Sequence, residues 1–157
     1  MLLISLRFLA LMLAALTTGM SFAHVLERPA KMRYDAALYG TLQKTLYAYW
    51  GPPNVGALVE ITAIAATIVL AWLVSDRESA LWMTAGAATA LVIAFPIVFF
   101  TLVAPANKAF LEASPPAMPA DWMEMRARWE DGHVIRFAFH LCALGLLILS
   151  VLIEMDA

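Results

Sequence analysis

Four long apolar stretches dominate the chain, and short polar connections separate them. They run over about residues 2–23, 55–74, 80–103 and 133–153. Each approaches the ~20 residues that an α-helix needs to cross the hydrocarbon core of a membrane. The alternating pattern of a half-buried strand is not found. The pattern therefore predicts an all-α fold, an integral membrane antiparallel four-helix bundle that residues 1–157 form as a single domain.

Local signals place the ends of these helices. A charged triplet at residues 76–78 predicts a tight turn between the second and third helices. Asp121, with Glu124 three residues later, resembles a capping box, so the last helix should begin well before its apolar stretch. Pro96 should kink the third helix. The helices are expected at about residues 2–26, 55–74, 80–103 and 121–153.

Two longer connections lie at the same end of the predicted bundle. Residues 33–50 place apolar and then aromatic side chains at helical spacing, which predicts a short interfacial helix in the first long loop. Gly51-Pro52-Pro53 should end this helix, and a second proline-rich loop should begin at Pro105. Lysine and arginine are concentrated in these loops, whereas the other end carries only Arg7 and Arg77. The long loops are therefore predicted to be cytoplasmic.

The first apolar stretch has a second interpretation as a cleaved signal peptide. Arg7 would be its basic start, and Ser21-Phe22-Ala23 resembles a small-residue cleavage site. Signal peptides usually have an apolar run of about 7–15 residues after a clearly basic start. This run is longer and its basic start is thin, which favours a membrane-spanning helix.

The composition agrees with a membrane protein. Hydrophobic residues make up 63% of the chain, and only 14% of the residues are charged, against ~25% in an average soluble domain. The net charge of −2 gives no reason to expect nucleic acid as a partner. Cys142 is the single cysteine, so an internal disulfide and a cysteine-based metal cluster are excluded. The expected partners are membrane lipid, with a lipophilic small molecule and further copies of the chain as open alternatives.

Two polar pairs should meet at the end of the bundle that carries the long loops. His24 and Glu27 lie at the end of the first helix, and Glu130 and His133 lie near the start of the last one. Because consecutive helices alternate in direction, both pairs fall on the same side. Charged groups at membrane depth are costly and usually face a partner or a polar cavity. These four residues are the candidates for catalysis.

A deeper polar layer follows about two helical turns further into the bundle. It consists of Glu60 in the second helix and of Arg136 and His140 in the last. Arg136 is the preferred partner of Glu60, because a guanidinium stays charged and can bind a carboxylate through two hydrogen bonds. A buried polar network or a substrate-binding role is expected for these residues.

The same residues leave the question of a metal open. Histidine and carboxylate ligands suit iron, zinc or manganese, so His24, Glu27, Glu130 and His133 could hold a single transition metal. The di-iron pattern of four-helix proteins fits poorly, because it needs Glu-x-x-His on two helices. Only Glu130 and His133 have that order. The alternatives are a structural ion-pair network and acid–base chemistry without a metal, and the cofactor is unknown: none, or one transition metal.

Three short motifs resemble those of a known family. The run from His24 to Lys31 resembles an H-x-L-E-x-P-x-K signature that follows a first helix. Pro105-Ala106-Asn107 resembles a P-x-N element after a third helix. Trp122 together with the run from Arg128 to His133 resembles a W…R-x-W-E-x-x-H element before a fourth, with Arg128 here directly before Trp129. The order and spacing over nearly the whole chain resemble the anthrone oxygenase-like family of small four-helix integral membrane proteins, most of them of unknown function.

The resemblance implies an activity and a set of residues. Anthrone oxygenases oxidise a polycyclic aromatic anthrone to the anthraquinone with molecular oxygen, without a conventional redox cofactor. The family's signature residues would carry over to His24, Glu27, Asn107, Trp129, Glu130 and His133. His24 and His133 would then be the better candidates for the general base, with Glu27 or Glu130 orienting them.

Three functions follow from these observations as expectations. The first is an oxidoreductase for a lipophilic aromatic or quinone-like substrate, in which a tuned base removes a proton. The second is a small proton-linked transporter with Glu60, Arg136 and His140 as the relay, although the chain has no internal repeat. The third is a non-catalytic membrane subunit or assembly factor.

Overall fold

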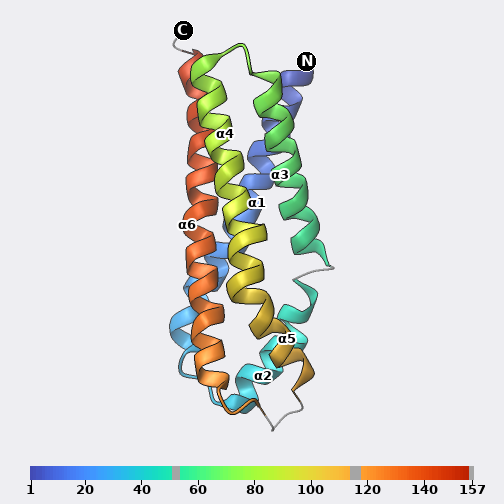
Figure 1. Ribbon diagram of the computed structural model, residues 1–157, viewed down its shortest axis with the longest axis vertical. Coiled ribbons are helices and arrows are strands. Elements are labelled where there is room, and N and C mark those ends of the chain that lie inside the picture. The colour runs from blue at the N-terminus through green and yellow to red at the C-terminus, as the bar shows by residue number, and fades with distance from the viewer. Residues whose placement is uncertain (51–53, 114–117, 156–157) are drawn as a thin grey trace.

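The protein is a bundle of long antiparallel helices (Figure 1). The structure is a computed structural model that describes residues 1–50, 54–113 and 118–155, and within these residues it contains helices and no strand. Four helical segments are long and apolar enough to cross a membrane, which confirms the predicted all-α four-helix bundle and fits a multi-pass membrane protein. They are Leu2–Lys31, Val55–Leu73, Glu78–Glu112 and Trp122–Met155.

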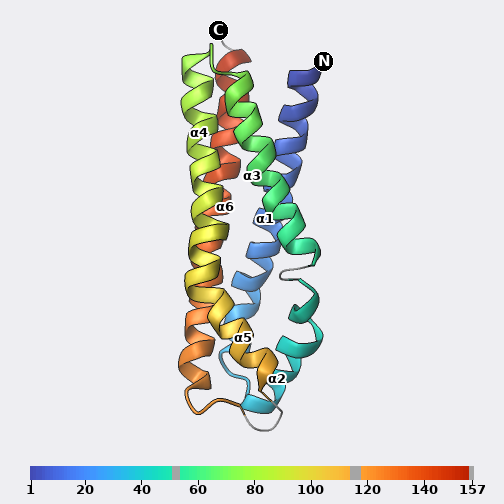
Figure 2. The ribbon, with the colours of Figure 1, turned by 45° about the vertical axis from the view of Figure 1, so that its right-hand side comes forward.

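The four segments form a closed ring in which each packs against two neighbours. Helix α1 (Leu2–Lys31) lies against α3 (Val55–Leu73) and α6 (Trp122–Met155), and α4 (Glu78–Val92) lies against the same two helices from the other side. Both termini lie at one end, and the shorter helices α2 (Ala36–Thr45) and α5 (Ala104–Glu112) lie at the other (Figure 2). The ring leaves an interior that side chains from all the segments can reach.

The third spanning segment changes its helical geometry halfway. Helix α4 continues into η2 (Ile93–Val103), an 11-residue π-helix that contains Pro96, and then into α5. A π-helix is a wider helix that occurs mostly as single-turn bulges. The predicted end at residue 103 is wrong, and so is the placement of Pro105 in a loop. Pro105 lies in the first turn of α5, where the missing N–H of proline costs little.

The first long connection forms a helix, but this helix is partly buried. Asp35 begins α2, and its carboxylate accepts a hydrogen bond from the Leu38 amide at 2.8 Å. Tyr39 and Gln43 are buried, and α2 packs against η1 (Tyr47–Tyr49) and α5. One face of the helix therefore packs onto the loop end of the bundle, while Leu38 on another face is exposed. The predicted stop at Gly51-Pro52-Pro53 lies outside the described residues.

The first long helix extends further than expected, and the last one has close to its expected length. Helix α1 continues through Pro29 to Lys31, five residues beyond the predicted end, because Lys31 makes buried ion pairs that offset the disruption by proline. Helix α6 runs without a break through Gly132. A Cβ atom there would come within 2.8 Å of Val103, so glycine lets α6 pack closely against η2. The extended α1 packs against α3 and α6.

The bundle divides along its length into two halves with different interiors. The half nearer the termini, called the alanine half, is filled by small and aliphatic side chains of all four segments. Its buried hydroxyl groups bond to their own helices, as Thr67 does to the Ala63 carbonyl at 2.8 Å. Glu154 closes its outer end by pairing with Arg7 at 2.6 Å and Arg77 at 2.7 Å. The core of the alanine half comprises Ala10, Ala14, Ala63, Ala66, Leu70, Val74, Ala80, Ala87, Ala90, Leu91, Ala143 and Leu147.

Candidate functional site

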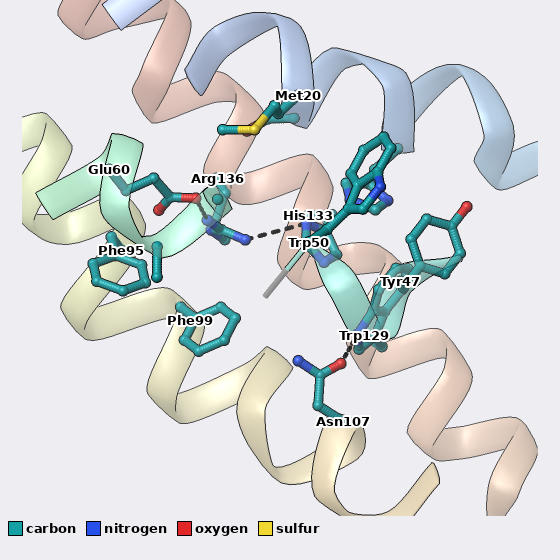
Figure 3. Close-up of a pocket in the computed structure, with 14 residues that line it drawn as sticks. Met20, Tyr47, Trp50, Glu60, Phe95, Phe99, Asn107, Trp129, His133 and Arg136 are labelled. Atoms are coloured by element: carbon teal, nitrogen blue, oxygen red, sulfur yellow. Dashed lines mark hydrogen bonds and ion pairs between the residues drawn. The ribbon is translucent and has the colours of Figure 1, made fainter. Parts of the chain in front are cut away.

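The other half, called the polar half, contains a small cavity of about 50 Å³. Side chains from all four long segments line it, together with Tyr47 and Trp50 from the first long connection (Figure 3). Water needs roughly 10–15 Å³ of such space per molecule, so the cavity has room for a few waters or for one small polar group of a ligand. Its lining residues are Met20, Ser21, His24, Tyr47, Trp50, Gly56, Ala57, Glu60, Phe95, Phe99, Asn107, Trp129, His133 and Arg136.

Two histidines from different helices stack on each other beside this cavity. The ring centroids of His24 on α1 and His133 on α6 are 3.9 Å apart, with an angle of 26° between the ring planes. Both side chains are buried, and His24 Nδ1 and His133 Nε2 have no hydrogen-bond partner. Trp129 packs edge-on against His24 at 5.0 Å between centroids. The predicted approach of the first and last helices at this end is therefore observed.

Aromatic side chains enclose the rest of the His24 ring. The centroid of Tyr47 lies 5.0 Å away and that of Trp50 lies 5.5 Å away. Trp50 can approach because Gly56 opens α3 on that side: a Cβ at Gly56 would lie 2.1 Å from the Trp50 carbonyl oxygen. In Figure 3, Trp50, Tyr47 and Trp129 gather on the side of the cavity where His133 lies. The histidine pair is thus held by packing on both sides.

Arg136 connects the deeper polar layer to the histidine pair. Its guanidinium forms a buried ion pair with Glu60, which confirms the partner predicted from the sequence. Its Nε donates to the Ala94 carbonyl at 3.2 Å, and its Nη1 lies 3.3 Å from His133 Nδ1. Ala94 belongs to the π-helix, whose wider turn leaves this carbonyl accessible to a side chain. The guanidinium is therefore fixed on three sides.

A second group of ion pairs lies on the loop side of the histidines. Its centre is Lys31, which was not predicted as a site residue. Lys31 is buried with Nζ 3.0 Å from Glu130 Oε2 and 3.5 Å from Glu27 Oε2. The ammonium also lies over the ring of Trp129, 4.6 Å from its centroid. Lys31 is four residues after Glu27 and seven after His24, so helical spacing already placed these three residues on one face. From the sequence, Lys31 was predicted only as one of the loop charges and as the last residue of the H-x-L-E-x-P-x-K motif, and its pairing with Glu130 was not predicted.

Two tyrosines from the α2 region complete this upper network. Tyr39 donates to Glu130 Oε1 at 3.1 Å, and Tyr47 donates to Glu27. Burial raises the pKa of the Tyr39 phenol above its ordinary value, and the charge of Glu130 raises it further. Burial and the hydrogen bond to Glu27 raise the pKa of Tyr47 in the same way. Both phenols therefore stay protonated and act as donors.

The carboxylates and His140 do not occupy the positions expected of them. Glu27 and Glu130 bind Lys31 and the tyrosines, and neither lines the cavity. Glu27 Oε2 is 3.9 Å from His24 Nδ1, beyond hydrogen-bond distance. His140 does not join Glu60 and Arg136; its Nδ1 lies 2.6 Å from Ser21 Oγ. The predicted catalytic and orienting roles stay predictions, and within the stacked pair of His24 and His133 it is Arg136 that contacts a ring nitrogen, Nδ1 of His133.

A larger cavity of about 380 Å³ adjoins the first one. Tyr47, Phe99 and Asn107 line both cavities. Asn107 is held by Trp129, whose indole N–H donates to its Oδ1 at 2.6 Å. Gln43, which is 3% exposed, also lines the larger cavity, and its Nε2 has no partner. The larger cavity is within the ~300–1,000 Å³ that ligand sites usually occupy.

The described residues do not contain three or more histidine, cysteine, aspartate or glutamate side chains arranged to hold one metal ion. The candidate ligands His24, Glu27, Glu130 and His133 are near one another, but Lys31 lies between the two carboxylates. Their oxygens are thereby directed toward an ammonium group. This donor set suits ion pairing better than metal coordination.

Comparison of the chain with protein-family models, with curated proteins and with solved structures gives no match.

Proposed function

We propose that this protein is a membrane oxidoreductase that removes a proton from a lipophilic aromatic substrate and lets molecular oxygen oxidise the resulting carbanion. The observation that carries the proposal is the stacked pair of His24 and His133. Both rings are buried, each has a nitrogen without a partner, and both line the same small cavity. Neutral imidazole is the usual general base near neutral pH. The three motifs that resemble the anthrone oxygenase-like family support the same reaction class.

The two adjoining cavities support a lipophilic substrate with one polar group. The inner cavity, at about 50 Å³, accepts only a small part of such a molecule. The outer cavity, at about 380 Å³, has room for an aromatic body between Tyr47 and Phe99. Phe100, which is 56% exposed, lines its opening. The reactive carbon would lie near the shared wall, within reach of the histidines.

The proposed reaction converts a methylene group between aromatic rings into a carbonyl. A histidine nitrogen takes one proton from the methylene carbon, and the carbanion transfers electrons to O2 as a C–O bond forms. The peroxide anion takes the proton back from the histidine. The carbon then loses its second proton while the O–O bond breaks. The proton and the departing hydroxide form water, and the carbonyl remains. The sum is one CH2 group and one O2 giving one C=O group and one water, so oxygen is the sole oxidant.

The alternative of proton transport has weaker support. Beyond His140, among the described residues, the buried hydroxyls of Thr67 and Ser150 bond to carbonyls of their own helices. The alanine half therefore offers no continuous polar path through the described bundle. Two adjoining cavities in the polar half fit an enzyme better than a relay.

Oxygen uptake with aromatic methylene compounds tests the proposal. We expect purified protein in detergent to accelerate oxygen uptake with anthrone or a related diaryl methylene ketone, with one quinone formed per O2. His24→Gln should lower the rate by about 10²–10⁴-fold, the usual contribution of a general base. Trp82→Phe, an exposed position near the opposite end, is the control and should keep the rate. No acceleration over empty micelles, or equal rates for wild type and His24→Gln, would contradict the proposal.

A further inference from the structure

The geometry points to a fixed division of labour within the histidine pair: His133 donates a hydrogen bond to a carbonyl oxygen of the ligand, and His24 accepts the proton. The assignment of His133 as a donor rests on the contacts of Arg136. The role of His24 as the proton acceptor rests in addition on the proposed function. The two parts are tested separately below.

Arg136 determines which nitrogen of His133 carries the proton. A guanidinium has only donors, so the contact between Arg136 Nη1 and His133 Nδ1 at 3.3 Å requires Nδ1 to accept. A neutral imidazole then carries its proton on Nε2. Glu60 and the Ala94 carbonyl hold the guanidinium from its other sides, so it cannot turn away from the ring. His133 is thereby held as the Nε2–H tautomer.

The Nε2–H group of His133 is prepared for a ligand. His133 is 6% exposed, it lines the inner cavity, and its Nε2 has no partner. A buried donor without an acceptor destabilises the protein, because it has lost its hydrogen bonds to water. A ligand oxygen in the inner cavity would remove that cost. The same tautomer makes Nε2 unable to accept a proton, so His133 is excluded as the general base while Arg136 stays in place.

His24 differs from its partner at this point. Neither of its ring nitrogens has a hydrogen bond to an arginine or a carboxylate; the nearest, Glu27 Oε2, is 3.9 Å from Nδ1. Stacking on His133 and the surrounding aromatic rings fix the plane of the ring without fixing its proton. His24 can therefore present an unprotonated nitrogen to the cavity. It is the histidine of the pair that is free to accept a proton.

The charges around the pair indicate the chemical class of the ligand group. Lys31 is paired with two carboxylates, Glu27 and Glu130, and Arg136 is paired with Glu60. Because both cations are already paired with carboxylates, the site has no free positive charge for an anion, and its neutral N–H donor favours an uncharged acceptor, which we assign as a ketone or quinone oxygen. When the neighbouring carbon loses its proton, negative charge develops on that oxygen. The hydrogen bond from His133 then strengthens, as in an oxyanion hole.

The tautomer also bears on metal binding. A metal-ligating histidine usually donates its second N–H to a carboxylate, a carbonyl or water. Nδ1 of His133 faces a donor, Arg136, which is the opposite polarity. Arg136 would therefore weaken His133 as a metal ligand through Nε2. The histidine pair is better suited to hydrogen bonding.

Nitrogen NMR of the wild-type protein in detergent tests the tautomer without any substrate. With ¹⁵N-labelled histidine, the His133 signals are assigned by their loss in His133→Gln. We expect the proton on Nε2 and none on Nδ1. In the double variant Glu60→Gln/Arg136→Met, which leaves no unpaired buried charge, we expect a mixture of the two tautomers. A proton on Nδ1 in the wild type, or an unchanged tautomer in the double variant, would overturn the assignment.

The donor role is tested with 9-fluorenone, an aromatic ketone that lacks the methylene group needed for oxidation. The infrared carbonyl band of bound fluorenone should shift to lower frequency in wild type, and His133→Leu should abolish the shift. His133→Gln keeps an N–H donor and should keep part of it, and His24→Gln should leave it in place. An unchanged shift in His133→Leu would show that His133 does not donate to the ketone.

Kinetics separate this inference from the proposed function. If a diaryl methylene ketone is oxidised, His133→Leu should lower kcat by about 10²–10³-fold, as loss of one oxyanion donor does. His133→Gln should recover at least a tenth of the wild-type rate, and His24→Gln should not. Equal loss in His133→Gln and His133→Leu would contradict the donor role. An infrared shift without any oxidation would refute the proposed function and leave the assignment of His133 intact.

Discussion

The polar half and the alanine half use the same four helical segments but are held together differently. In the alanine half, Ala63 and Ala87 are fully buried, so the helices approach through small side chains. In the polar half, long side chains connect different helices: Arg136 on α6 reaches Glu60 on α3, and Lys31 on α1 reaches Glu130 on α6. The comparison indicates that one half provides the packing and the other provides the pocket. The next three predictions test this distinction.

The largest expected effect is the loss of one partner of the buried ion pair. Glu60→Leu leaves the Arg136 guanidinium without its carboxylate, and breaking a buried pair typically costs about 3–5 kcal/mol. Glu60→Gln keeps a hydrogen-bond acceptor, so the free energy of unfolding in detergent should fall less. Thr67→Val on the same helix removes a hydroxyl that bonds only to its own backbone, so it should cost less than about 1 kcal/mol.

Unfolding titrations with SDS measure these differences. The double variant Glu60→Leu/Arg136→Leu should recover part of the stability lost in Glu60→Leu, because no buried charge is left unpaired. Equal tolerance of Glu60→Leu and Glu60→Gln would show that Glu60 does not take part in a buried network.

An intermediate effect should come from enlarging matched alanines of α3. Ala63 is fully buried in the alanine half, and overpacking a dense core costs about 1–3 kcal/mol. Ala57 lines the inner cavity, so Ala57→Val can place its added methyl groups in empty space. We expect Ala63→Val to lower the unfolding free energy and Ala57→Val to lower it less. Ala57→Val should weaken fluorenone binding more than Ala63→Val does, because Ala57 lines the inner cavity. Equal destabilisation by both would mean that the two halves are packed alike.

The smallest effect is expected at alkaline pH. Burial raises the pKa of Tyr39, so the folded protein holds the phenolic proton more tightly than the unfolded chain does. The stability linked to this group is complete below the unfolded pKa of about 10 and declines as the pH rises above it. Tyr39→Phe should therefore lose less stability between neutral and strongly alkaline pH than the wild type. Identical pH profiles of unfolding would contradict this linkage.

Sequence alone determined the fold class and the end of the bundle where the site lies. Four apolar segments of spanning length permit few other arrangements, because backbone groups in a membrane must be satisfied within helices. The alternation of helix direction then brought His24 and His133 to one end. The partner of Glu60 also followed, since Arg136 was the permanent cation at a matching depth. These inferences depend on helical period and length, which are local properties of a sequence.

Tertiary structure decided which groups touch and what each nitrogen can do. The burial of Lys31 depends on Glu130, 99 residues away in sequence, and the burial of Gln43 depends on how α2 folds back onto the bundle end. The π-helix of η2 presents the Ala94 carbonyl to Arg136, and Arg136 in turn fixes the proton of His133. Helical period gives the face of a residue but not its rotamer or its contacts across the bundle. Those contacts decide which histidine of the pair donates a hydrogen bond and which one accepts a proton.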